Sequence, residues 1–225
     1  TLTASFVPVF LGTTIALTIE GEMINFPLFF AMLVASMLIQ AATNMFNEYY
    51  DYKLGLDNEH SVGIGGTIVR HGVAPSTIMA IALSFYGIAL LLGIYICAMS
   101  SWWIAVVGLI CMLIGYLYTG GPYPIAYSPF GELVSGTVMG MGIVLIAFFI
   151  QTKTVTLEAV LLSVPSMILV GAIMLSNNIR DIVGDTEGGR KTMAILVGRH
   201  NAVYILSLFF IVSYLWIVGL VIIED

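Results

Sequence analysis

The chain has 225 residues, of which 60% are hydrophobic and only 9% are charged, and its formal net charge is −6. Its mean hydropathy is +1.05, whereas an average soluble domain carries about 25% charged residues. This composition indicates an integral membrane protein and excludes a soluble enzyme. We expect one helical membrane domain over residues 1–225, with no room for a separate soluble domain.

Apolar runs of about 20 residues, the length of a helix that crosses a bilayer, mark the membrane spans. We expect spans at 3–19, 28–50, 76–98, 102–118, 131–151, 158–180 and 201–223. Helices are expected because lipid cannot satisfy the hydrogen bonds of an open backbone. The predicted fold class is therefore all-α, a polytopic transmembrane bundle of about seven spans.

The distribution of basic residues predicts the orientation, because Lys and Arg concentrate in cytoplasmic loops. Six of the seven basic residues follow the second and sixth spans: Lys53, Arg70, Arg180, Arg190, Lys191 and Arg199. The loops after these spans are therefore expected in the cytoplasm. The same regions carry many acids, namely Glu48, Asp51, Asp57, Glu59, Asp181, Asp185 and Glu187. Membrane topology does not explain why these acids gather here, so we look for an explanation in the chemistry of the site.

The acids belong to two similar segments, one at the end of the second span and one at the end of the sixth. At about 100° per residue, four polar residues of the first segment share about one quarter of a helix surface: Asn44, Asn47, Glu48 and Asp51. In the second segment Asn177, Asp181 and Asp185 follow one another at intervals of four residues along one face. We interpret the two segments as two halves of one site.

Carboxylates crowded at a membrane boundary repel one another and resist desolvation, so they need cations. Asp and Asn oxygens without clustered His or Cys suit Mg²⁺, which usually takes one or two carboxylates together with phosphate oxygens of a substrate. The two segments therefore predict a Mg²⁺-diphosphate site. Nearby bases would neutralise the remaining phosphate charge: Lys53, Arg70, Arg180, Arg190 and Lys191.

A third polar stretch carries four tyrosines beside Gly and Pro: Tyr116, Tyr118, Tyr123 and Tyr127. Their rings would stabilise a cation if they wall a cavity, and the alternative is ordinary anchoring at the membrane interface. A diphosphate site backed by apolar spans and aromatic rings predicts an allylic polyprenyl diphosphate as substrate. Its C–O bond would ionise, and an electron-rich acceptor would attack the carbocation.

At these motifs the chain resembles the UbiA superfamily of intramembrane aromatic prenyltransferases, most of all its menaquinone-pathway branch. The resemblance covers essentially the whole chain and rests on the following segments: Asn47-Glu-Tyr-Tyr-Asp51, Gly55-Leu-Asp57, Gly65-Gly-Thr-Ile-Val-Arg70, Gly120-Gly-Pro-Tyr-Pro, Gly131-Glu132, Asn177-Asn-Ile-Arg-Asp181-x3-Asp185 and Gly189-Arg-Lys-Thr192. It implies Mg²⁺-dependent transfer of a polyprenyl group from its diphosphate to 1,4-dihydroxy-2-naphthoate, with loss of the carboxylate, to give a demethylmenaquinol. The implied setting is a bacterial plasma membrane, with the site facing the cytoplasm. Membrane lipid is an expected partner, and nucleic acid is not.

The resemblance also implies roles for individual residues. The metal-side residues would be Asn47, Asp51, Asp57, Asn177, Asp181 and Asp185, with Asp51, Asp57 and Asp181 as the catalytic ones. The diphosphate would contact Arg70, Arg190 and Lys191, with Lys53 as a weaker candidate, and the cavity wall would include Asn44, Tyr118 and Tyr123. Asp57 and Glu132 are candidates for the base that deprotonates the acceptor, and Glu48 stands where the family usually has Asp.

Several alternatives stay open. The family usually has nine spans, so either the last two helices are absent or the chain was trimmed after Asp225; the start at Thr1, without Met, suggests trimming there as well. Another branch of the superfamily would use a different acceptor, such as 4-hydroxybenzoate or homogentisate. A non-enzymatic cation carrier would instead place its acids near the bilayer midplane.

Overall fold

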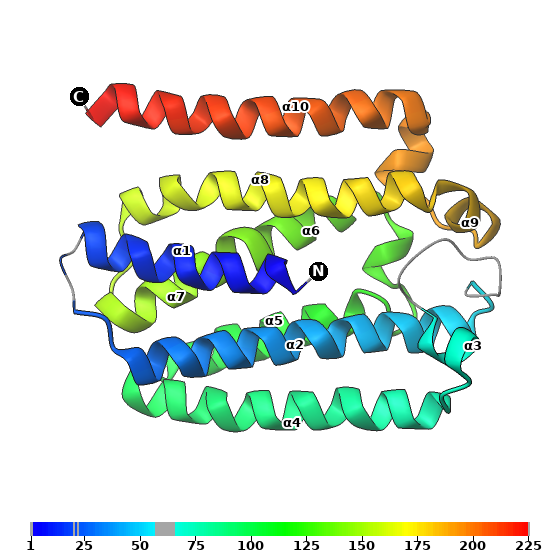
Figure 1. Ribbon diagram of the computed structural model, residues 1–225, viewed down its shortest axis with the longest axis horizontal. Coiled ribbons are helices and arrows are strands. Elements are labelled where there is room, and N and C mark those ends of the chain that lie inside the picture. The colour runs from blue at the N-terminus through cyan, green and yellow to red at the C-terminus, as the bar shows by residue number, and fades with distance from the viewer. Residues whose placement is uncertain (1, 20, 22, 57–65, 225) are drawn as a thin grey trace.

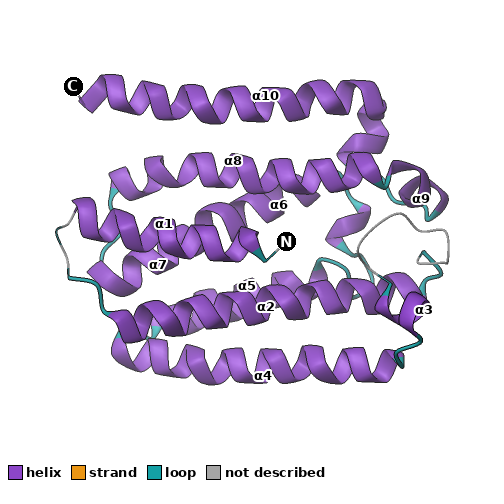
Figure 2. Ribbon diagram, in the orientation of Figure 1, coloured by secondary structure: helices purple, strands orange, loops and turns teal. Residues whose placement is uncertain are grey.

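The computed structural model describes residues 2–19, 21, 23–56 and 66–224. Within these ranges every regular element is a helix and no strand occurs (Figure 2). The predicted all-α class is confirmed. Asp57, expected on the loop after the second span, lies outside the described residues.

In the described part of the chain, seven helical segments correspond to the seven predicted spans. Five are long and apolar enough to cross a bilayer, namely α2 (Phe26–Lys53), α4 (Pro75–Met99), the continuous stretch Gly131–Thr152, α8 (Leu157–Arg180) and α10 (Met193–Glu224), and two shorter apolar helices complete the set, α1 (Thr3–Ile19) and α5 (Trp103–Leu117). The largest shift from prediction is at α10, which begins before residue 201. Gly198 has φ +80° there, so the chain bends and the long straight part of α10 follows the bend.

The helices lie side by side, with α10 at one edge against α8 and with α2 against α4 (Figure 1). The chain ends of α2 and α8 that carry the acidic segments point to the same side of the bundle. The short helices α3 (Thr67–His71) and α9 (Ile182–Glu187) follow them there (Figure 1). A 3₁₀ turn, η1 (Ile125–Tyr127), lies between α5 and the Gly131–Thr152 stretch.

Buried clusters hold these two helix ends in place. Phe46, near the end of α2, is buried between the rings of Tyr86 on α4 and Tyr116 on α5, with ring centroids 5.1 and 5.5 Å away. Near the end of α8, Leu175 and Ile179 are buried against the beginning of α10. Such apolar packing stabilises each helix end against the bundle. The acidic segments therefore project from rigid supports.

The stretch Gly131–Thr152 is built from α6 (Gly131–Ser135), a π-helical segment η2 (Gly136–Gly142) and α7 (Ile143–Thr152). Two glycines let η2 touch the backbone of α8 directly: a Cβ on Gly140 would lie 2.6 Å from both the Met167 Cα and the Ser166 carbonyl oxygen, and Gly136 meets the Met167 carbonyl oxygen in the same way. The Ser166 hydroxyl donates to the Gly140 carbonyl oxygen over 3.1 Å. This close approach fixes the position of η2 beside α8, and both segments line the cavity.

Replacing Gly140 by Ala should destabilise the fold, because the new methyl group meets backbone atoms that cannot rotate away. Overpacking of this kind costs about 1–3 kcal/mol, so we expect a lower midpoint of thermal unfolding in detergent. Gly87→Ala on α4 is the matched control, since a Cβ there meets nothing within 4 Å. An unchanged midpoint for Gly140→Ala would contradict direct backbone contact between η2 and α8.

Candidate active site

A large cavity with a volume of about 1720 Å³ lies within the bundle. Its polar end is lined by residues from both acidic segments: Asn44, Asn47, Glu48, Asp51, Asn177, Asn178, Arg180, Asp181, Asp185, Glu187 and Arg190. The remaining wall is mainly apolar and includes Met32, Ala35, Ile39, Met112, Val138, Met139, Ile146, Val170 and Met174. The two acidic segments, far apart in the sequence, thus share one cavity that is charged at one end and mainly apolar elsewhere.

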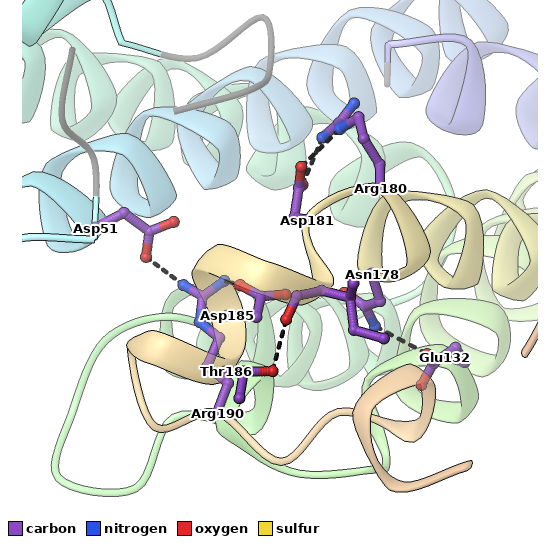
Figure 3. Close-up of polar contacts among 9 residues, drawn as sticks. Asp51, Glu132, Asn178, Arg180, Asp181, Asp185, Thr186 and Arg190 are labelled. Carbon is purple, nitrogen blue, oxygen red and sulfur yellow. Dashed lines mark hydrogen bonds and ion pairs between the residues drawn. The ribbon is translucent and has the colours of Figure 1, made fainter. Parts of the chain in front are cut away.

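Arg190 joins the two acidic segments at the polar end (Figure 3). Its Nη1 donates to Asp185 Oδ1 over 2.9 Å, and its Nη2 donates to Asp51 Oδ1. The Arg190 side chain is only 12% exposed. One carboxylate from α2 and one from α9 therefore converge on a single buried cation.

The backbone after α8 explains how Arg190 reaches this position. The amides of Asp181 and Asp185 donate to the carbonyl oxygens of Asn177 and Asp181, each over 2.9 Å, so Asp181 both ends α8 and leads directly into α9. Gly189 then adopts φ +74°, which side chains rarely allow. This reverses the chain, and the Arg190 amide donates back to the Asp185 carbonyl oxygen over 2.9 Å.

Burial shapes the electrostatics of this pair. Loss of water raises the pKa of the Asp185 carboxyl above its usual range, and the Arg190 guanidinium opposes that rise. Burial also works against the charged form of Arg190, but Asp51 and Asp185 more than offset it, so its pKa lies above its usual value. The polar end of the cavity thus strongly favours a bound cation.

Asp181 has a different partner. It accepts from Arg180 Nε and Nη2 over 2.7 and 2.6 Å, and both side chains are partly exposed (Figure 3). An exposed pair of this kind contributes about 0–1 kcal/mol to stability. Asp181 therefore remains readily available to another cation in the cavity, unlike the two carboxylates that share Arg190.

Glu48 ties α2 to the helix that carries Arg70. Its Oε1 accepts from the Ile68 amide over 2.9 Å and its Oε2 accepts from the Thr67 hydroxyl over 3.3 Å. These are the first residues of α3, where amides have no partner inside the helix. The sequence pattern placed Glu48 on the acidic face, and it does line the cavity, but its bond to α3 was not foreseen. In the sequence, only the hydroxyl of Thr67, which donates to Glu48, could have indicated this contact.

Glu132 does not lie on the cavity wall among the described residues, although it was a candidate base. It is 2% exposed, and its Oε1 accepts from Asn178 Nδ2 over 2.8 Å (Figure 3). Within the described chain its Oε2 has no hydrogen-bond partner. Because Asn178 itself lines the cavity, Glu132 is connected to the site through that amide.

The remaining predicted site residues differ in whether they reach the cavity. Tyr118 lines the cavity, but Tyr123 is 92% exposed and is not among the described lining residues, because Gly121, with φ +86°, turns the loop outward. Lys53 lies over the ring of Tyr49, with Nζ 5.9 Å from the ring centroid. The exposed residues Lys53, Arg70 and Lys191 are likewise not found on the wall in the ranges that the structure covers. In the described chain, therefore, Tyr123 is found on the surface and not on the cavity wall where it was predicted.

The donor set fits Mg²⁺ only if a substrate completes it. In the ranges that the structure covers, no three His, Cys, Asp or Glu side chains lie close enough to hold a metal ion. However, Asp51 and Asp185 already share one cation, and the Asn47 and Asn177 amides line the same cavity. Mg²⁺ takes few protein carboxylates and accepts substrate phosphate oxygens. These residues therefore fit a Mg²⁺-diphosphate complex.

An all-helical membrane fold with two acidic helix ends on one apolar cavity is the architecture expected of an intramembrane prenyltransferase. A model of the UbiA prenyltransferase family matches residues 5–224, and the chain belongs to this family. The family predicted from the motifs is confirmed.

Two relatives with known names show where the chain is similar within this family. The chain is 62% identical over 222 residues to the 1,4-dihydroxy-2-naphthoate octaprenyltransferase of Bacillus subtilis (strain 168), covering 99% of this chain and 71% of that protein. It is 31% identical over 220 residues to UbiA prenyltransferase domain-containing protein 1 of Xenopus tropicalis, covering 94% of this chain and 61% of that protein. The chain thus spans less than two thirds of the frog relative.

Solved structures show the same fold. A UbiA homologue from Archaeoglobus fulgidus, described as bound to GPP and Mg²⁺, superposes with a TM-score of 0.67 at 14% identity, covering 95% of this chain and 73% of the homologue. The same comparison with the structure described as bound to DMAPP and Mg²⁺ gives a TM-score of 0.65 at 15% identity, over 96% of this chain and 75% of that one. At such low identity the likeness establishes the fold.

Proposed function

We propose that this protein transfers a polyprenyl group from an allylic polyprenyl diphosphate to 1,4-dihydroxy-2-naphthoate, with loss of the acceptor carboxylate, giving a demethylmenaquinol. The observation that carries the proposal is the shared cavity, where two acidic helix ends meet at one end of a long apolar pocket. The choice of acceptor rests on the 62% identity to the B. subtilis octaprenyltransferase. We place the reaction at the cytoplasmic face of a bacterial plasma membrane, because the basic loops lie on the same side as the site.

Six residues would hold Mg²⁺ on the two sides of the diphosphate: Asn47, Asp51, Asp57, Asn177, Asp181 and Asp185. When bound, Mg²⁺ would draw charge from the departing diphosphate. Arg190 would exchange its contacts with the two carboxylates for the diphosphate oxygens that it can bind with two parallel hydrogen bonds. Arg70, Lys191 and Lys53 are secondary candidates, since none of them reaches the cavity wall within the described chain.

The remaining wall would orient the prenyl group and exclude water. Met139, Met174 and Val170 line the apolar part of the cavity, next to the polar end. A dry pocket protects an allylic carbocation from attack by water and strengthens every electrostatic contact inside it. Tyr118, which lines the cavity, presents an aromatic ring that can stabilise such a cation. In this proposal the apolar walls exclude water and the acidic helix ends balance the charge.

The test is prenyl transfer by the purified protein with a long-chain allylic diphosphate, comparing 1,4-dihydroxy-2-naphthoate with 4-hydroxybenzoate, each with Mg²⁺ and with EDTA. We expect Mg²⁺-dependent product and released CO₂ with the naphthoate alone. Product with the benzoate alone would retain the mechanism and reassign the acceptor. No product with either acceptor or with homogentisate would contradict the proposal and favour a cation carrier.

A further inference from the structure

Tyr127 makes one contact with Arg190 and one with the residue after it, although it is not among the described residues that line the cavity. The Arg190 guanidinium lies over its ring, with Cζ 5.3 Å from the ring centroid. Its backbone carbonyl oxygen accepts from the amide of Lys191, the next residue, over 3.1 Å. Tyr127 therefore holds both the side chain of Arg190 and the backbone beside it.

The segment that carries Tyr127 is itself well anchored. The Tyr127 amide donates to the Pro124 carbonyl oxygen over 3.0 Å, and the Ser128 hydroxyl donates to the Ile125 carbonyl oxygen over 2.7 Å. The Ala126 amide reaches back to the carbonyl oxygen of Tyr118 over 2.9 Å, at the end of α5. These bonds make η1 a fixed platform that joins α5 to the loop after α9.

Arg190 needs such support for a physical reason. Its long side chain loses rotamer freedom when its guanidinium is held between Asp51 and Asp185. The two terminal nitrogens are taken by those carboxylates, and in the described part of the chain Nε has no hydrogen-bond partner. The flat face of the guanidinium is what remains, and an aromatic ring binds that face by cation–π attraction and stacking. Tyr127 supplies that ring.

We propose that Tyr127 is a positioning residue, which holds Arg190 at the junction of the two acidic helix ends so that its guanidinium is preorganised for the diphosphate. The proposal rests on the proposed function, since it takes Arg190 as a diphosphate ligand. It assigns Tyr127 no contact with substrate: its whole effect passes through Arg190. The ring matters and the phenol hydroxyl does not.

Tyr127→Leu, which removes the ring, is compared with Tyr127→Phe, which keeps it. The first readout is the Kd for geranyl diphosphate with Mg²⁺, measured by titration calorimetry in detergent without any acceptor. We expect Tyr127→Leu to raise this Kd about five- to tenfold and Tyr127→Phe to leave it within about twofold, from the usual strength of a cation–π contact. In turnover, the KM for the diphosphate should rise with Tyr127→Leu, while the KM for the acceptor stays unchanged.

A double-mutant cycle makes the test specific. In an Arg190→Ala background, Tyr127→Leu should cause no further loss, because its effect is carried by Arg190 alone. Thermal unfolding in detergent checks that each variant folds. Tyr127→Met is a second variant without a ring, to be used if Tyr127→Leu does not fold.

The outcomes separate this proposal from the proposed function. An unchanged Kd for Tyr127→Leu, equal impairment of Tyr127→Phe, or a full additional loss in the Arg190→Ala background would each overturn the role of Tyr127. Wild-type protein that binds geranyl diphosphate but prenylates no aromatic acceptor would refute the proposed function, and the Kd comparison would still decide on Tyr127. Wild-type protein that binds no allylic diphosphate would overturn both.

Discussion

Replacing Asp51 by Asn should lower kcat/KM for prenyl transfer by about 10³-fold, the upper range for losing one group that stabilises transition-state charge. Asp51 is one of the two carboxylates that converge on a single cation, and its side chain is only 13% exposed. Asn keeps the shape of the side chain but removes its charge, so the site loses part of its ability to hold Mg²⁺ against the diphosphate. Initial rates over a range of Mg²⁺ concentrations would measure this loss.

The control for this change is Glu158→Gln, which removes an exposed acid at the opposite end of α8. We expect it to retain wild-type rates, and both variants should insert into membranes normally. Asp181→Asn should be impaired in the same way as Asp51→Asn, because it lines the same end of the cavity. Wild-type turnover by Asp51→Asn or Asp181→Asn would contradict the metal assignment.

Arg190→Gln should have the second large effect. We expect it to weaken the use of the diphosphate and to strengthen the binding of Mg²⁺. Removing one partner of a buried charged pair costs about 2–5 kcal/mol, so the KM for the diphosphate should rise about 10²-fold. The Mg²⁺ concentration for half-maximal rate should fall, because Asp51 and Asp185 lose the cation that competes with the metal. Steady-state kinetics with each ligand varied in turn would resolve the two effects.

Lys153→Gln is the matched control for Arg190→Gln, since it removes a positive charge at the other end of the bundle. There the Lys153 ammonium donates to the Met99 carbonyl oxygen over 2.8 Å, and no cavity residue is involved. We expect unchanged KM values for this variant. If Arg190→Gln raised the Mg²⁺ requirement instead, Arg190 would be supporting the metal site rather than competing for it.

The sequence alone determined which segments cross the membrane and which polar residues gather at their ends. Hydropathy sufficed for the spans, because lipid excludes every backbone conformation with open hydrogen bonds and so leaves only the helix and the closed barrel. Helical periodicity predicted that Asn177, Asp181 and Asp185 lie together, and all three line the cavity. α8 and α9 are nevertheless separate helices, with Asp181 (φ −92°, ψ 7°) between them.

Only the tertiary structure decided which of these polar residues meet. The contacts of Arg190 with Asp51, of Glu48 with the start of α3 and of Glu132 with Asn178 join residues that are not neighbours in the chain. Local periodicity says nothing about such distances. Among the tyrosines, identical in chemistry and close in sequence, Tyr118 lines the cavity and Tyr123 faces outward, because a glycine turn between them redirects the backbone. The spans follow from the cost of placing backbone in lipid, whereas the site depends on how loops direct side chains once the helices have packed.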